Sequence, residues 1–490
     1  MCLHTALLAA ALAGCAVGPD YRRSAPPAVA SYTAEALPAG TAEAKGVGGA
    51  AQRFVPGGEI PARWWEMFRS QALDRWIREA LANNPTLDAA EAALRRAQEI
   101  RRARSGELLP TVDGTVSASR QKPSGASFGD ASLRINPFTL YNASVSVSYA
   151  LDLFGRTRRE VEALQAQVDF QAFQVEGAHL ALTSNIATAA FQEASLRGQL
   201  QATRDILATQ EALLAMVERR FELGGVAKTD VLAQRASLAQ ARATLPPLEK
   251  RLAQTRHLLA ALAGRYPGNT ADLPEFDLKD FQLPEELPVS LPSSLARRRP
   301  DIRSAEERLH AASAAVGVAT ANLYPNVTLS GQYGTTATRI GDLFGPGSAV
   351  WGFGAGLLQP IFHGGALEAN RRAEVAGFDQ AAAQYRETVL QAFREVADVL
   401  RALEYDASAL KAQSDAESAA RDTLDIATKQ VRFGAASYLS LLNAQREYHQ
   451  ARILRVQAQA LRFADTAALF QALGGGWWNR DNPSDGASRR

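Results

Sequence analysis

Two long stretches of the chain keep the hydrophobic spacing of an α-helix and contain no proline. They cover residues 156–222 and 366–433. Alanine and leucine dominate their apolar positions, with glutamine, glutamate and arginine in between. At about 1.5 Å of rise per residue, each helix would reach roughly 100 Å, whereas globular helices average about 11–12 residues. The composition predicts closely packed, coiled-coil-like helices.

Shorter helical stretches accompany each long one. Apolar residues at helical spacing predict helices up to residue 108, with a break at Pro85, and returning helices over 229–263 and 438–473. The adjacent Pro246 and Pro247 predict a kink in the first returning helix. Residues 75–108 and 229–263 together match one long helix in length, so we expect them to run antiparallel beside it.

Four segments instead alternate apolar and small polar residues with the period of a β-strand. They are residues 111–119, 142–151, 326–334 and 350–358. Each segment has about 9–10 residues, close to the ~9–11 that a tilted strand needs to cross a bilayer. A soluble hairpin packed on a helix is the alternative interpretation.

This order of elements occurs twice. Residues 83–112 match residues 298–327, with Pro85 at Pro300, and residues 219–242 match 429–452. A period this long exceeds that of solenoid repeats, so it indicates a duplicated half-molecule. We divide the chain into regions accordingly: a first repeat at 63–264, an equatorial connector at 265–297, a second repeat at 298–475 and a flexible tail at 476–490.

The N-terminus has the features of an export signal. Residues 1–14 are short and apolar, and Leu12-Ala13-Gly14-Cys15 resembles a bacterial lipobox, in which cleavage precedes a cysteine that becomes diacylated. We therefore expect a signal peptide over 1–14 and lipidation at Cys15, followed by an extended arm over 15–62. An ordinary signal peptide with an incidental cysteine is the alternative.

Composition narrows the function. The net charge of +2 does not indicate a nucleic-acid partner. The two cysteines, Cys2 and Cys15, allow neither a disulfide framework nor a zinc cluster in the body of the chain. The six histidines are scattered, and the sequence contains no HExxH, P-loop or GxSxG motif. We expect no enzyme, no catalytic residue, no metal and no cofactor.

No stretch of about 18 apolar residues follows residue 15, so no transmembrane helix is expected. Four strands cannot close a barrel, and an open sheet edge in lipid is costly. A form that spans the membrane must therefore be an oligomer, and three chains would supply twelve strands, an even number within the known range.

The whole mature chain resembles the TolC-like outer-membrane efflux lipoproteins, nearest the OprM/NodT group. The resemblance rests on the order, spacing and duplication of several motifs. Besides the lipobox, these are Gly18-Pro19-Asp20-Tyr21, Trp64-Trp65 with Phe68, Arg299-Pro300-Asp301-Ile302, Ala321-Asn322-Leu323-Tyr324-Pro325 and Gln359-Pro360-Ile361-Phe362. The paired turns at 224–230 and 434–442 complete the set.

The resemblance implies a mainly α protein with a β-barrel part. A homotrimer would form a periplasmic α-helical barrel and a 12-stranded β-barrel in the lipid of the Gram-negative outer membrane. It further implies a passive channel of a tripartite efflux system, which takes drugs or other small molecules from an inner-membrane pump of the resistance–nodulation–division class through a periplasmic adaptor. A channel for protein or oligosaccharide export and a lipid-anchored coiled-coil scaffold without a pore are the alternatives.

The resemblance also implies a gate and adaptor-docking site at the two helix-turn tips. The tip residues in this sequence are Gly224, Gly225, Val226, Ala227, Lys228, Thr229 and Asp230, and Gly434, Ala435, Ala436, Ser437 and Tyr438. We expect Asp230 to accept a hydrogen bond from a neighbouring tip, with Arg235 or Arg446 as donors. Ser440 and Asn443 stand where relatives often carry acidic residues, so a carboxylate ring is missing there.

Overall fold

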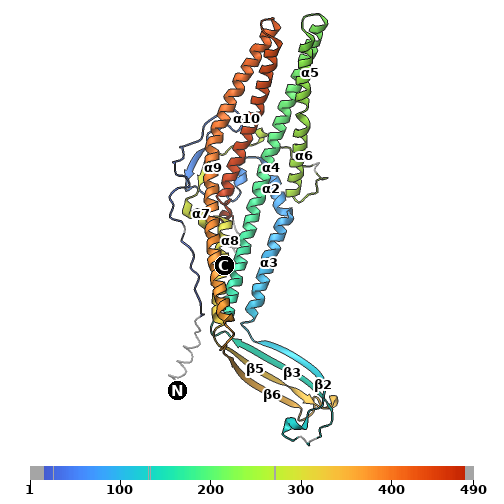
Figure 1. Ribbon diagram of the computed structural model, residues 1–490, viewed down its shortest axis with the longest axis vertical. Helices are drawn as coiled ribbons and strands as arrows, with labels where there is room; N and C mark the ends of the chain where they lie inside the picture. Colours follow the sequence, from blue (N-terminus) through green and yellow to red (C-terminus); the bar gives the residue numbers. More distant parts are fainter. Residues whose placement is uncertain (1–15, 26, 131, 133, 270–271, 481–490) are drawn as a thin grey trace. The chain divides into compact units, whose positions relative to one another are not determined.

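The computed structural model describes residues 16–480, except residues 26, 131, 133 and 270–271 (Figure 1). The expected signal peptide and the expected lipidation site, Cys15, lie outside this range. The described chain forms two compact units. The first unit combines Met1–Ser24, Ala93–Ala172 and Ser304–Arg386, and the second combines Ala25–Ala92, Phe173–Arg303 and Glu387–Arg490. Each unit therefore draws on both sequence repeats.

The first unit contains a four-stranded antiparallel sheet in the order β2-β3-β5-β6. The strands are β2 (Thr111–Gln121), β3 (Phe138–Leu151), β5 (Asn326–Ala337) and β6 (Ala349–Leu358). Each extends beyond its alternating segment, because backbone pairing such as Gln121 with Phe138 continues where the side-chain pattern stops. Strand length here is set by the hydrogen-bonded ladder as well as by alternation.

Helices make up most of the rest, and the helices of the second repeat follow the same order as those of the first (Figure 1). The first series is α2 (Gln71–Asn83), α3 (Pro85–Gly106), α4 (Arg156–Glu222), α5 (Lys228–Arg242) and α6 (Leu245–Leu262). The second is α7 (Pro292–Arg298), α8 (Pro300–Ala321), α9 (Ala366–Arg432) and α10 (Tyr438–Ala472). The long helices α4 and α9 have 67 residues each, and α3 and α8 have 22 each. No helix of the described residues is both long and apolar enough to cross a membrane.

The two series differ where the first returning helix was expected to kink. The prediction of one kinked helix over 229–263 is wrong in detail, because the segment forms two helices. Helix α5 ends at Arg242, and α6 begins at Leu245 with Pro246 and Pro247 in its first turn. Proline lacks the backbone N–H but fits the first helical turn, so it starts a new helix there. The corresponding α10 has no such interruption and runs for 35 residues.

An aromatic cluster forms the centre of the second unit. The rings of Trp64 and Phe470 stack with centroids 5.5 Å apart, and Phe68 lies 4.9 Å from Phe191. Phe463 lies 5.5 Å from Phe191, and all five side chains are almost fully buried. Burial of one such side chain stabilises a fold by about 1.5–3 kcal/mol. The cluster fixes the 3-10 turn η1 (Trp64–Phe68) against α4 and α10.

The arm and the connector are more regular than expected. Strand β1 (Arg53–Pro56) of the arm pairs in parallel with β4 (Glu286–Val289) of the connector. Beside it, Gln52 is fully buried and its Nε2 donates to the carbonyl of Pro284 at 3.0 Å. The arm from residue 25 onward therefore belongs to the second unit. Four-residue strands that pair across such a sequence distance leave no usable period in the sequence.

The beginning of the expected flexible tail is also ordered. Residues Trp477–Asn479 form the 3-10 turn η5, and the indole of Trp477 donates to the carbonyl of Arg298 at 2.7 Å. Arg480 forms an ion pair with Glu176 of α4 at 3.0 Å. The boundary at residue 476 is therefore wrong, because η5 still packs on the second unit. Residues 481–490 lie outside the described range.

Arg299 of the Arg-Pro-Asp motif joins three segments of the second unit. Its guanidinium lies 2.6 Å from Asp301 and 2.7 Å from Glu395 of α9, and Nη1 donates to the carbonyl of Ala472 at the end of α10. Arg299 is buried, and its two carboxylate partners outweigh the effect of burial, so its pKa is raised. The motif thus ties the start of α8 to α9 and α10.

The Gly-Pro-Asp-Tyr motif of the arm is held within the first unit. The ring of Tyr21 stacks on His310 of α8 with centroids 4.4 Å apart, and Asp20 pairs with the buried Arg159 of α4 at 2.6 Å. Gly18 has a φ of +95°, and a Cβ there would lie 2.5 Å from Cα of Gly317. Glycine is therefore required by both conformation and space.

Candidate functional site

The first tip is a helix–turn–helix between α4 and α5 (Figure 1). The N–H of Gly225 donates to the carbonyl of Arg220 at 2.8 Å, and the N–H of Gly224 donates to Phe221 at 2.9 Å. This pair of bonds, with Gly224 at a φ of +76°, is the Schellman motif that ends many helices. A Cβ at Gly224 would meet open space, so the positive φ alone requires glycine.

The second tip, between α9 and α10, repeats this geometry. The N–H of Ala435 donates to the carbonyl of Gln430 at 2.8 Å, and that of Gly434 to Val431 at 3.2 Å. Gly434 has a φ of +73°. The structure therefore places the two glycines singled out in the sequence, Gly224 and Gly434, at equivalent positions of two matching turns.

The helices that leave the tips begin with different caps. In the first tip, Oδ2 of Asp230 accepts from the N–H of Ala227 at 3.1 Å. In the second, the hydroxyl of Ser437 accepts from the N–H of Ser440 at 3.3 Å, and the hydroxyl of Ser440 donates to the carbonyl of Ser437. Asp230 thus stabilises the N-terminus of its own helix, where a negative charge is favourable. Its Oδ1 has no hydrogen bond among the described residues.

The two candidate arginine donors have different partners. Arg235 of α5 binds Glu218 of α4, with its Nε and Nη2 at 3.0 and 2.7 Å from Oε1. Nη2 of Arg446 donates to Oδ1 of Asn443 on the same helix at 2.6 Å. The structure therefore does not bring Asp230 together with either arginine in one chain. Arg235 ties α5 to α4, and such an exposed pair contributes about 0.2–1 kcal/mol.

An apolar cluster below the turns joins the two hairpins within the second unit. We call it the subtip cluster, and its buried members are Leu213, Val217, Val231, Ala427, Val431, Tyr438, Leu441, Leu442 and Ala444. Sequence reasoning placed Tyr438 at the tip and missed the others. Residues on four different helices contribute, so only their packing in three dimensions reveals the cluster.

Tyr438 is the polar member of the subtip cluster. Its hydroxyl is buried and has no hydrogen-bond partner among the residues that the structure describes. Burial raises the pKa of Tyr438 to about 12, while the charge of Arg220 lowers it and that of Asp230 raises it. Both charged residues belong to the first hairpin, so Tyr438 of the second hairpin lies close to the first tip. A buried neutral hydroxyl without a hydrogen-bond partner lowers the stability of this packing.

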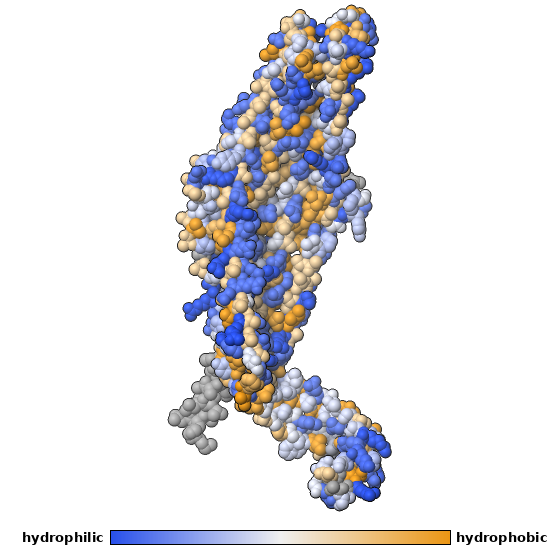
Figure 2. All heavy atoms as spheres, in the orientation of Figure 1, coloured by the Kyte–Doolittle hydropathy of each residue, from blue (hydrophilic) through white to orange (hydrophobic). Residues whose placement is uncertain are grey.

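Each tip also exposes a large apolar side chain that sequence reasoning did not select. Leu223 is 73% exposed and Phe433 is 81% exposed, and each directly precedes the glycine of its turn. Hydrophobic residues are visible at both hairpin ends in Figure 2. The sequence signal for them was available, because both occupy the same position of the duplicated segment. The two side chains add exposed apolar surface to both hairpin ends.

A groove of about 880 Å³ lies beside the subtip cluster, between the α4–α5 hairpin and α10. Gln240 and Ser237 of α5 line one side, and Asn443 and Arg446 line the other. His449 also lines it, and burial, assisted by the charge of Arg452, lowers its pKa to about 4. This histidine is therefore neutral at physiological pH and adds no charge to the groove.

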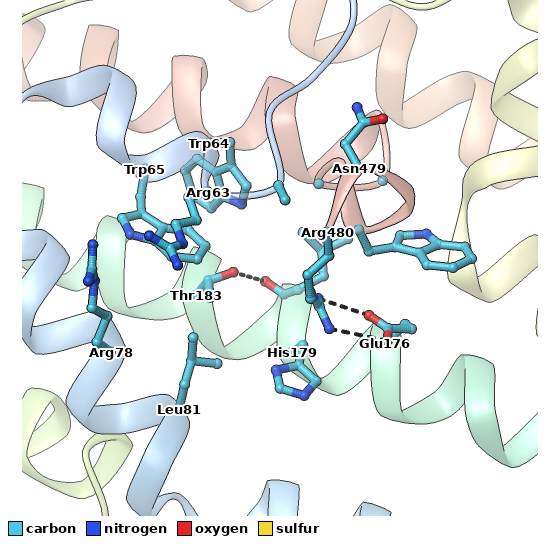
Figure 3. Close-up of a pocket in the computed structure, with 15 residues that line it drawn as sticks. Arg63, Trp64, Trp65, Arg78, Leu81, Glu176, His179, Thr183, Asn479 and Arg480 are labelled. Atoms are coloured by element: carbon cyan, nitrogen blue, oxygen red, sulfur yellow. Dashed lines mark hydrogen bonds and ion pairs between the residues drawn. The ribbon is translucent and has the colours of Figure 1, made fainter. Parts of the chain in front are cut away.

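A second pocket, of about 600 Å³, lies between η1, α2, α4 and η5 (Figure 3). Arg480 and Glu176 form an ion pair in its lining, and His179 lies one turn further along α4. Burial raises the pKa of Glu176, with Arg480 opposing, and burial lowers the pKa of His179. Among the residues that the structure describes, no group of His, Cys, Asp and Glu could hold a metal ion.

Known proteins share both the sequence and the fold. The family of outer membrane efflux proteins matches residues 76–265 and 291–475. The pyoverdine export outer membrane protein OpmQ of Pseudomonas aeruginosa is 33% identical over 436 residues, covering 87% of this chain and 90% of that protein. The toluene efflux pump outer membrane protein TtgF of Pseudomonas putida is 32% identical over 475 residues, covering 96% of both.

Two solved structures have the same fold. The outer-membrane channel OprN has a TM-score of 0.85 at 30% identity, covering 94% of this chain and 100% of that one. The outer membrane protein VceC from Vibrio cholerae has a TM-score of 0.80 at 28% identity, covering 85% and 100%. The expected fold class is confirmed, and the chain belongs to the outer membrane efflux protein family of TolC-like channels.

Proposed function

We propose that three copies of this chain form a passive conduit through the outer membrane. The conduit receives small molecules from an inner-membrane pump of the resistance–nodulation–division class through a periplasmic adaptor. The chain performs no chemistry and binds no cofactor, so the energy comes from the pump.

The observation that carries this proposal is the open four-stranded sheet. Its outer strands, β2 and β6, each have a partner on one side only. One face exposes large apolar side chains, among them Trp351 at 71% and Phe353 at 85% exposure. A sheet with such a face belongs in lipid, where unpaired backbone groups cost several kcal/mol each. When three copies pair edge to edge, the backbone groups of β2 and β6 find partners and the apolar face can lie in lipid. The resulting barrel has an even number of strands.

The two tips are the proposed gate and adaptor-docking site. Matching Schellman turns fix the backbone at Gly224 and Gly434, and the exposed Leu223 and Phe433 offer apolar contacts to a partner. Asp230 keeps one carboxylate oxygen available for a neighbouring tip. Ser440 and Asn443 are uncharged, so they add no ring of carboxylates to this entrance.

We also propose the lipid anchor and the regions of the chain inferred from the sequence. Acylation of Cys15 would place its acyl chains directly before the arm, at about 0.8 kcal/mol for each buried CH₂ group. The signal peptide, the two repeats and the connector keep the bounds given above, with the tail beginning after Arg480.

The names of the relatives suggest that the transported molecules are small organic compounds. OpmQ is named for pyoverdine export and TtgF for toluene efflux. These two compounds differ widely in size and polarity, so the pump rather than the channel would select the substrate.

Single-channel recording tests the proposal. Purified protein added to a planar lipid bilayer should produce discrete, uniform conductance steps. If the protein binds to lipid but produces no conductance steps, and a variant with loosened tips such as Asp230→Ala produces none either, the result would instead support a scaffold without a pore.

A further inference from the structure

The register of the sheet assigns every strand residue to one of two faces. Residues that pair directly across antiparallel strands point to the same side. One row across the sheet is Asp113, Ser146, Gln332 and Gly352. The next row is Thr115, Ser144, Gly334 and Val350. This face therefore carries hydroxyl, amide and glycine positions over most of its width.

The opposite face is apolar. Its rows include Val112, Val147, Gly331 and Phe353, and then Gly114, Val145, Tyr333 and Trp351. The large side chains line a shallow groove of about 670 Å³. This is the face that would contact lipid, so the hydroxyl-bearing face would surround the conduit.

The four strands contain only two charged residues, Asp113 and Arg120, both in β2. Asp113 lies on the hydroxyl-bearing face. Arg120 lies on the other face, since it alternates with Ser119 and pairs with Thr139. The carboxylate of Asp113 is exposed and has no ion pair or hydrogen bond among the described residues. It is thus an uncompensated negative charge on an otherwise neutral wall.

A second carboxylate near the sheet does not act in the same way. Asp152 follows β3 directly, but its two oxygens accept from the backbone N–H groups of Thr157 and Arg158, at 3.0 and 2.9 Å. The guanidinium of Arg158 also lies 3.2 Å from it. Its charge is therefore neutralised locally.

We propose that Asp113 gives the conduit its preference for cations over anions. This inference rests on the proposed function, because three copies are needed to place Asp113 in a ring facing the lumen. The tip positions Ser440 and Asn443 carry no charge. On the hydroxyl-bearing face of the four strands, Asp113 is the charged residue, so each copy would add one carboxylate to the wall of the conduit.

Screening decides where the effect is measurable. The Debye length is about 3 Å at 1 M salt, about 8 Å at 0.15 M and about 30 Å at 0.01 M. A ring of charges on the wall of a wide barrel can act on ions at the centre only when the Debye length approaches the radius. Cation preference should therefore be clear at about 0.01 M salt and vanish at about 1 M.

Reversal potentials in planar bilayers test the assignment. The wild-type channel, Asp113→Asn, Asp113→Glu and Arg120→Gln are each recorded in a potassium chloride gradient at low and at high salt. We expect Asp113→Asn to bring the permeability ratio of potassium to chloride close to that of free diffusion. Asp113→Glu keeps the charge and should retain the preference. Arg120→Gln, which removes a charge from the same strand but the other face, should leave the ratio unchanged.

Two outcomes would overturn the inference. A wild-type channel without cation preference at about 0.01 M salt excludes a role for Asp113, and so does an Asp113→Asn channel that retains the wild-type ratio. A further variant, Asp230→Asn, distinguishes the tip from the barrel wall: if it abolishes the preference while Asp113→Asn does not, the tip carries it. A wild-type protein without conductance would contradict the proposed channel itself.

Discussion

Replacing Tyr438 with phenylalanine should stabilise the packing of the two hairpins against each other. The hydroxyl of Tyr438 is buried in the subtip cluster, and no group in the described part of the chain forms a hydrogen bond with it. A polar group left in this state costs about 1–3 kcal/mol, because it has lost its water. Phenylalanine keeps the ring and removes the oxygen. The small void that the oxygen leaves offsets part of the stabilisation. We expect a net stabilisation of about 1 kcal/mol.

Hydrogen–deuterium exchange at the start of α10 measures this effect. Amides near Leu441 and Leu442 lie in the same cluster, so their exchange reports its local opening. A gain of 1 kcal/mol should slow their exchange about five-fold. The matched control is Tyr405→Phe in α9, because Tyr405 is 60% exposed and its hydroxyl can reach water. That control should leave the exchange rates unchanged.

Unchanged or faster exchange in Tyr438→Phe would refute this reasoning. It would mean that the hydroxyl has a partner in the assembled protein, such as an enclosed water molecule or a group from a neighbouring copy. Tyr438→Ser separates the two contributions of the side chain. It keeps a hydroxyl but removes the ring, so it should loosen the cluster and speed the exchange of the same amides.

Three further variants test other parts of the account. Arg299→Ala leaves two carboxylates without their guanidinium and should lower the free energy of unfolding by about 2–3 kcal/mol, seen as a lower thermal midpoint, whereas the exposed Arg78→Ala should change it little. Asp230→Ala removes a cap and a tip carboxylate, so it should cost about 1 kcal/mol at the tip and raise the leak of large antibiotics; unchanged conductance and drug susceptibility would exclude this role. Burial beside Asp406 raises the pKa of Asp465 to about 8, so the native state holds a proton that the unfolded state releases. Its contribution to stability is therefore present below the ordinary pKa of an aspartate and is lost as the pH rises through about 8, and the thermal midpoint of Asp465→Asn should fall less between pH 6 and pH 9 than that of the wild type.

The fold class could be predicted from the sequence because the strongest patterns extend over long segments and depend only on residues that are near each other in the chain. A proline-free stretch with helical spacing predicts α4 over Arg156–Glu222, and a period of two predicts each strand of the sheet. The duplication then links the two halves, since a turn seen at Gly224 is expected again at Gly434. Such signals survive because each depends on residues close together in the chain.

Features that depend on distant residues could not be predicted. Strand β1 is only four residues long, and its partner β4 lies far along the chain, so neither has a recognisable period. The subtip cluster needs four helices to be placed before its members are visible. Asp230 was expected to serve a neighbouring tip, but in the structure it first satisfies the N–H of Ala227. Local capping uses the nearest acceptor, and a motif alone does not show this.

Negative-stain imaging of the detergent-extracted protein tests the central claim most directly. If three copies close the open sheet, the particles should be rods with threefold symmetry and a helical tube at one end. Monomeric or dimeric filaments would contradict the account, because the strands would then have no neighbours with which to close a barrel and the protein could not be a conduit.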